Sequence, residues 1–156
     1  MTKYYIKGNH DYYFEEIENI FYKSGFETLN NTEDIIYKND NEFIKIKGYG
    51  SSIKNDFNYS ENNNDDYTIS VIHEPDNASL INDSNLILAG HSHNLQINIP
   101  YLKTLFKVNG CMKYYNNYYD LGNTKLYINS GIGTSKSRLR LFNPPTINFY
   151  RLTTLN

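Results

Sequence analysis

One stretch, residues 86–93, constrains this chain more than any other part of its sequence. Four apolar residues end at Ala89, and Gly90 separates them from two histidines, His91 and His93. The apolar run predicts a buried strand, and the glycine predicts that the chain turns where this strand ends. Ligands of open α/β sheets bind beyond the carboxyl ends of strands, and two imidazoles in one loop can face one metal ion. The stretch therefore predicts a metal site at a strand end.

The other two histidines stand in comparable positions. His73 follows the apolar run 67–72, and His10 follows a shorter strand pattern at residues 2–7. A short connection joins residues 67–72 to residues 86–89, which predicts two parallel strands whose carboxyl ends share one edge of a sheet. His73 should then lie beside the His-x-His loop. An isolated His-x-His pair is more often an ordinary solvated loop, but four histidines that all follow predicted strands favour a shared site.

Residues 8–11, with the sequence Gly-Asn-His-Asp, follow the first of these strand patterns. Asp11 is expected to cap a helix over residues 12–24, because its carboxylate can accept a backbone N–H of the first turn. Gly25 is expected to end that helix. The side-chain oxygen of Asn9 can close a turn or ligate a cation, and the residues alone leave both interpretations open.

Further strand patterns complete a single α/β domain over residues 1–156. Residues 33–37 and 43–47 predict a hairpin around an Asn-Asp-Asn turn. A third pattern, at residues 125–129, is followed by a Gly/Ser loop. That loop occupies residues 130–135, and closing strands are expected at residues 138–142 and 147–152. Arg138 and Arg140 are either surface charges or anion ligands.

Composition narrows the classes of function. The net charge of −2 and the pI of about 6.1 give no electrostatic basis for binding nucleic acid. The single cysteine, Cys111, excludes an internal disulfide and a Cys-rich zinc site. No apolar run approaches the roughly 20 residues of a membrane span, and no secretion leader is recognisable. We therefore expect a cytoplasmic protein, with peripheral membrane association left open.

Three motifs occur in a fixed order: Gly-Asn-His-Asp at 8–11, Val-Ile-His-Glu-Pro-Asp at 71–76 and Ala-Gly-His-Ser-His at 89–93. In this order they resemble the later motifs of the calcineurin-like metallophosphoesterases. The remainder resembles one bacterial branch of that family, which has a Gly-His-Thr-His-Gly-Gly-Gln loop, a Gly-Leu-Gly-Thr-Ser loop after a strand, and an Arg-rich, Pro-containing tail. The counterparts here are residues 93–96, 130–135 and 140–145, and the likeness extends from residue 4 to residue 155. It implies an α/β sandwich of β-sheets flanked by helices, the fold of metallo-dependent phosphatases.

The resemblance also implies roles for individual residues. Asn9, His73 and His91 would ligate one divalent transition metal, and His93 would ligate its partner. His10 would be catalytic, stabilising charge at the scissile phosphate or protonating the leaving oxygen. The metal would be Mn, Fe, Zn or Co, two ions in a complete site. The implied reaction is hydrolysis of a phosphomonoester, phosphodiester or pyrophosphate by metal-activated water, on a small-molecule or lipid-linked substrate.

Two departures from the family pattern bear on activity. Asn94 and Leu95 stand where the family usually has two glycines, which predicts a less free backbone. Family members also begin with Asp-x-His and Gly-Asp motifs, and neither occurs ahead of Asn9. We therefore expect an N-terminally truncated phosphoesterase domain that lacks the first strand-helix units and is completed by an N-terminal fragment.

Three hypotheses follow from the sequence. The first is a metallophosphoesterase, weakly active or inactive until its missing half is supplied. The second is a non-catalytic remnant or binding module that keeps the scaffold. The third is an unrelated α/β domain with coincidental histidines, which the match in the tail disfavours.

Overall fold

The computed structural model describes residues 2–61, 66–99, 101–102, 105, 107–134 and 138–153. Its strands are β1 (Lys3–Tyr5), β2 (Phe26–Thr28), β3 (Thr32–Asn39), β4 (Glu42–Gly48), β5 (Thr68–Ile72), β6 (Leu86–Ala89), β7 (Tyr118–Asp120) and β8 (Lys125–Ile128). Its helices are α1 (Ile17–Lys23) and three short 3-10 helices, η1 (Asp11–Tyr13), η2 (Ser52–Lys54) and η3 (Pro75–Leu80). No helix among these residues has the length and apolar character needed to cross a membrane.

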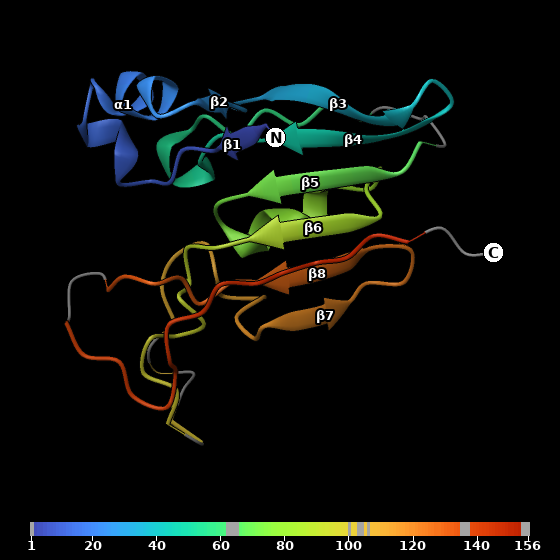
Figure 1. The fold of residues 1–156 in the computed structure, drawn as a ribbon. Coiled ribbons are helices and arrows are strands. Elements are labelled where there is room, and N and C mark those ends of the chain that lie inside the picture. Colours follow the sequence, from blue (N-terminus) through green and yellow to red (C-terminus); the bar gives the residue numbers. More distant parts are fainter. Residues whose placement is uncertain are drawn as a thin grey trace.

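Six strands form the main sheet, in the order β3-β4-β5-β6-β8-β7. Strands β4, β5, β6 and β8 run parallel, and β3 and β7 are antiparallel to their neighbours at the two edges. The carboxyl ends of the parallel strands therefore share one edge, on the side where α1 and the long loops gather (Figure 1). Strands β1 and β2 form a separate parallel pair. The α/β class predicted from the sequence is confirmed.

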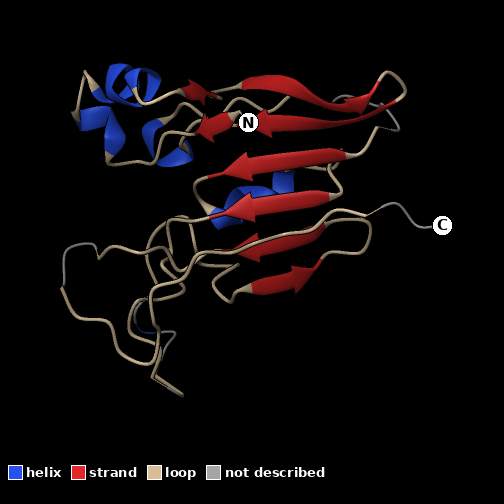
Figure 2. Cartoon of the chain, viewed as in Figure 1, coloured by secondary structure: helices blue, strands red, loops and turns tan. Residues whose placement is uncertain are grey.

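The hydrophobic core lies on one face of the main sheet. Ile72, Ile87 and Leu126, from β5, β6 and β8, are almost completely buried. Ala78 of η3 packs against them in the same cluster, and η3 lies behind β5 and β6 in Figure 2. Successive residues of a strand point to opposite faces, so the alternating burial of β8 follows from its sequence. This packing fixes the positions of the loops that leave β5 and β6.

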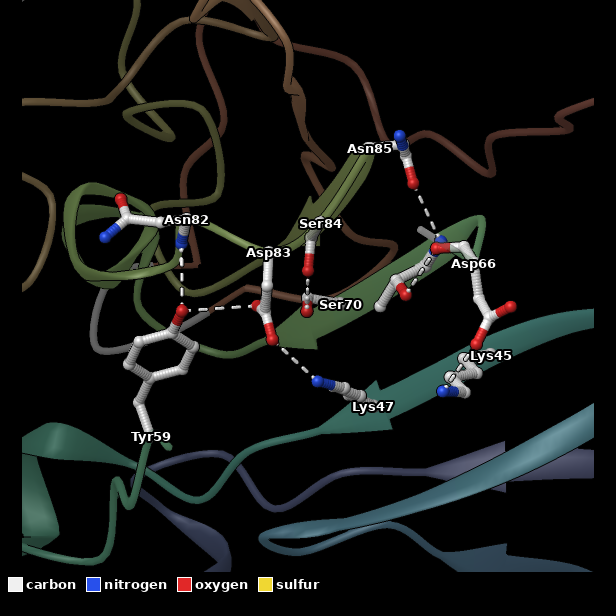
Figure 3. A network of polar contacts seen from close by, with 10 residues as sticks. Lys45, Lys47, Tyr59, Asp66, Ser70, Asn82, Asp83, Ser84 and Asn85 are labelled. Atoms are coloured by element: carbon white, nitrogen blue, oxygen red, sulfur yellow. Dashed lines mark hydrogen bonds and ion pairs between the residues drawn. The ribbon is translucent and has the colours of Figure 1, made fainter. Parts of the chain in front are cut away.

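A network of polar side chains links β4 and β5 to the segment ahead of β6 (Figure 3). Lys47 of β4 forms an ion pair with Asp83 at 2.7 Å, and the two side chains are 8% and 4% exposed. The hydroxyl of Tyr59 donates to the other oxygen of Asp83 at 3.3 Å. Ser70 and Ser84 share a hydrogen bond of 2.6 Å between their hydroxyls. Polar groups buried in this way specify one arrangement of neighbouring strands, because each needs its partner.

Several local predictions are confirmed and others are wrong. The hairpin is present as β3 and β4, and β5 and β6 are parallel neighbours. The helix predicted over residues 12–24 is divided into η1 and α1, and Gly25 follows its end at φ +78°. Asp11 does not cap that helix; its carboxylate instead accepts the N–H of Gly8 at 2.7 Å. The Gly/Ser loop expected at 130–135 is described only as far as Thr134.

The closing strands predicted at residues 138–142 and 147–152 are wrong. The described part of this tail contains one isolated bridge, between Leu141 and Ile97, and no strand. Strand β7, which pairs with β8, is not among the strands predicted from the sequence. The edge position of the sheet beyond β8 is therefore taken by β7.

Candidate metal centre

Three loops at the carboxyl edge of the sheets supply the histidines. Asn9 and His10 lie in the turn between β1 and η1, which is closed by the hydrogen bond from Asp11 N–H to Gly8 O at 3.0 Å. His73 follows β5, and the His91 loop follows β6. The N–H of Gly90 donates to the carbonyl oxygen of His73 at 3.2 Å, which ties the last two loops together.

The side chains of Asn9, His73 and His91 meet at one point. His73 Nε2 lies 2.9 Å from Asn9 Oδ1 and 3.1 Å from His91 Nδ1. The two imidazole rings are edge to face, with centroids 4.9 Å apart. The relation between His73 and His91 that strand polarity predicts is thus found in the structure, and Asn9 joins them from a separate sheet.

These three atoms have too few protons for all of them to be hydrogen-bonded to one another. His91 Nε2 lies 2.7 Å from the carbonyl oxygen of Asn109, which only accepts, so in a neutral imidazole Nε2 is the nitrogen that carries the proton. His91 Nδ1 therefore presents a lone pair, as does Asn9 Oδ1, and only His73 Nε2 can carry a hydrogen between them. Metal-bound histidines commonly hold the other ring N–H on a backbone carbonyl in this way. The donor set fits a divalent transition metal.

The charge state of His73 agrees with such a role. Burial, with the charges of His91, His93 and His10 acting in the same direction, lowers the pKa of His73 from 6.5 to about 3. The ring is therefore neutral at physiological pH, which is the form that ligates metals. His10 itself is exposed, with its ring 6.4 Å from that of Tyr13, and it follows Asn9, whose side chain contacts His73. All four histidines thus lie at the same edge.

The loop that carries His93 has an unusual backbone. His91, His93, Asn94 and Leu95 have φ values of +59°, +47°, +49° and +54°, a region that L-residues with side chains rarely occupy. The side-chain amide of Asn143 donates to the carbonyl oxygens of His93 and Asn94. The conformation is one that the two glycines of the family pattern would adopt readily. Here hydrogen bonds from the tail and burial of Leu95 hold it in place.

Arg140 fixes the other side of His93. Its guanidinium donates to the carbonyl oxygens of Ser130 at 2.7 Å and Gly131 at 3.1 Å, and Nη2 lies 3.4 Å from His93 Nδ1. Burial and then the charge of Arg140 lower the pKa of His93. These contacts show that Arg140 is more than a surface charge, and its assignment as an anion ligand stays a prediction. Its donors are directed at backbone carbonyls, so it organises the loop around His93.

Sequence reasoning missed a carboxylate next to this cluster. Among the described residues, one group of possible metal ligands brings His73, Glu74 and His91 together, with ligand atoms within 4.8 Å of one another. Glu74 belongs to the Val-Ile-His-Glu-Pro-Asp motif, so its position beside His73 was a signal, although no role was drawn from it. His93 lies outside that group. No local pattern announced Asn109 or Asn143, because both act through contacts with residues distant in the sequence.

Two known proteins are similar in sequence to this chain. It is 33% identical over 92 residues to the "Uncharacterized metallophosphoesterase YkuE" of Bacillus subtilis, a match that covers 58% of this chain and 32% of that protein. It is 32% identical over 164 residues to the "Uncharacterized metallophosphoesterase Cj0846" of Campylobacter jejuni, which covers 92% of this chain and 40% of that protein. The chain thus spans about a third to two fifths of the length of these relatives. No family model and no solved structure matches it.

Proposed function

The chain is related to the metallophosphoesterases, and from this premise we propose that it serves in metal-dependent hydrolysis of phosphoesters. One observation above all supports the proposal. Asn9 Oδ1, His73 Nε2 and His91 Nδ1 converge within about 3 Å of their neighbours and have too few protons to satisfy one another. Such an arrangement of lone pairs is suited to a cation.

In this proposal Asn9, His73 and His91 hold one divalent ion, and His93 belongs to a second. Divalent ions at such a site supply polarisation of a phosphoryl oxygen and activation of water. His10 is exposed at the same edge and donates a proton to the leaving oxygen. Arg140 and Asn143 act indirectly, because they hold the backbone and the ring of His93.

The second ion needs ligands beyond those that the described residues offer. The described group of possible ligands contains His73, Glu74 and His91 but not His93. We propose that a segment with Asp-x-His and Gly-Asp motifs, supplied as a separate fragment or a further part of the same protein, provides the remaining carboxylates. We also propose that the metal is Mn, Fe, Zn or Co, that the substrate is a small-molecule or lipid-linked phosphoester, and that the location is cytoplasmic.

The test is hydrolysis of bis(p-nitrophenyl) phosphate in the presence of Mn²⁺ or Co²⁺, with the His73→Ala variant as control. We expect slow, metal-dependent release of nitrophenol from the chain alone and faster release when a fragment with the two motifs is added. A chelator and the His73→Ala substitution should both abolish it. Hydrolysis that survives either treatment contradicts the proposal. A chain that binds metal but hydrolyses nothing in any combination supports a non-catalytic binding module.

A further inference from the structure

Glu74 is a carboxylate enclosed by the protein. It follows His73 directly and has no exposed surface. Its Oε1 accepts a hydrogen bond from the hydroxyl of Ser51. Its Oε2 accepts from the backbone N–H of Ser52 at 3.1 Å and from the hydroxyl of Ser52 at 3.5 Å. The carboxylate is thus held by neutral donors of the loop that follows β4.

The same side chain is pressed against the histidine cluster by a turn of the chain. Gly110, at φ +88°, lies so close that a Cβ there would approach Glu74 Cγ at 2.7 Å and His91 Cδ2 at 3.4 Å. The preceding residue, Asn109, accepts the ring N–H of His91. The turn therefore packs on Glu74 and orients His91 at the same time. One Glu74 oxygen consequently lies within 4.8 Å of ligand nitrogens of His73 and His91.

A buried carboxylate is costly unless a positive charge compensates it. Within the described part of the chain, no lysine or arginine forms an ion pair with Glu74. The three ligands Asn9, His73 and His91 are neutral, so a divalent ion among them also lacks compensation. We propose that Glu74 is the anionic member of this metal site, and that its negative charge stabilises the bound ion. The inference rests on the metal binding in the proposed function and adds a residue to it.

The experiment measures Co²⁺ binding to the full chain by calorimetry, with Glu74→Gln as the decisive variant. Glutamine keeps the shape of the side chain and can still accept the N–H of Ser52, but it carries no charge. We expect its Co²⁺ affinity to fall by about 10- to 100-fold. The matched control is Asp76→Asn. The Asp76 carboxylate accepts the backbone N–H groups of Met112, Lys113 and Tyr114, so this variant disturbs the neighbouring loop without touching the Glu74 charge.

Glu74→Gln with the affinity of the wild type, or with a loss no larger than that of Asp76→Asn, overturns the inference. If Glu74→Gln does not fold, infrared difference spectra of the wild type still test the inference. Adding Co²⁺ should shift a carboxylate stretching band, and an unperturbed carboxylate region contradicts the proposal. A wild-type chain that binds no Co²⁺ at all refutes the proposed function, which separates that failure from a failure at Glu74 alone.

Discussion

Arg140 connects the tail of the chain to His93. Its guanidinium donates to several carbonyl oxygens of residues 130–133. Arg140→Lys replaces a planar fork of five donors by one ammonium, so some of these carbonyls lose their partner. We expect the free energy of unfolding to fall by about 1–3 kcal/mol, measured by urea denaturation, and the imidazole resonances of His93 to shift in NMR spectra. Arg138→Lys, at an exposed position two residues away, is the control and should change neither. Equal effects of the two variants would count against the role of Arg140.

His10 lies at the metal edge without joining the cluster of ligands. Because it is exposed and its assigned role is proton transfer, His10→Ala should reduce turnover by about 10²- to 10⁴-fold in any preparation active on a phosphodiester. The metal content of the variant, measured by atomic absorption, should stay at the wild-type level. Loss of bound metal in His10→Ala would indicate that His10 is a metal ligand and would contradict its assigned role in proton transfer.

At this scale, strand polarity allowed part of the site to be predicted. His73 and His91 follow parallel neighbouring strands, and the structure places their nitrogens 3.1 Å apart. The contact between Arg140 and His93, across 47 residues of sequence, has no counterpart in any local pattern. Glu74 was visible in a motif, but its burial and its bonds to Ser51 depend on how β4 and β5 are placed.

Between elements, the turn after β1 must fit against the loop after β5. A Cβ at Gly8 would approach His73 Cε1 at 2.6 Å, whereas a Cβ at Gly90 meets nothing within 4 Å. Gly8→Ala should therefore displace His73, destabilise the fold by about 1–3 kcal/mol and weaken Co²⁺ binding. Gly90→Ala, next to His91 in the same site, should be tolerated. Calorimetric affinity and urea denaturation of both variants check this, and a tolerated Gly8→Ala would show that the turn does not pack on His73.

The buried pair of Lys47 and Asp83 joins β4 to the segment ahead of β6. Lys47→Met leaves the Asp83 carboxylate buried without its cation, which should cost about 3–5 kcal/mol of unfolding free energy. The exposed pair of Lys125 and Asp120 is the comparison, since its side chains are 43% and 55% exposed. Lys125→Met should leave the urea midpoint unchanged within error. Similar losses from the two substitutions would mean that the buried pair has no special part in the sheet.

The elements were predictable where hydrophobic pattern and strand pairing agree. The run 86–89 became β6 with the same bounds, because a buried central strand is apolar throughout. The pattern at residues 147–152 failed, because an apolar alternation does not show whether the backbone finds a partner. That segment runs along β8, and Tyr150 contacts the ring of Tyr127 at 5.1 Å without forming a ladder (Figure 1). Phe149 is 92% exposed there.

For the whole molecule, the relation to metallophosphoesterases and the convergence at the carboxyl edge point to one claim. The claim is that Asn9, His73 and His91 form a metal site, with His93 held nearby for a second ion. The relatives are about 2.5 and 3 times as long as the matched region, since it covers 40% and 32% of them. Metal binding by these residues is therefore the part of the function that this chain itself can demonstrate.

The most direct measurement is the stoichiometry of Co²⁺ binding to the chelator-treated chain, obtained by isothermal titration calorimetry. We predict about one ion per chain, bound with modest affinity because Asn9, His73 and His91 are neutral and the carboxylate of Glu74 alone compensates the charge of the ion. Binding should be lost in His73→Ala and retained in His93→Ala, since His93 lies outside the described ligand group. A chain that shows no saturable binding, or whose binding is unchanged by His73→Ala, would contradict the assignment of this metal centre.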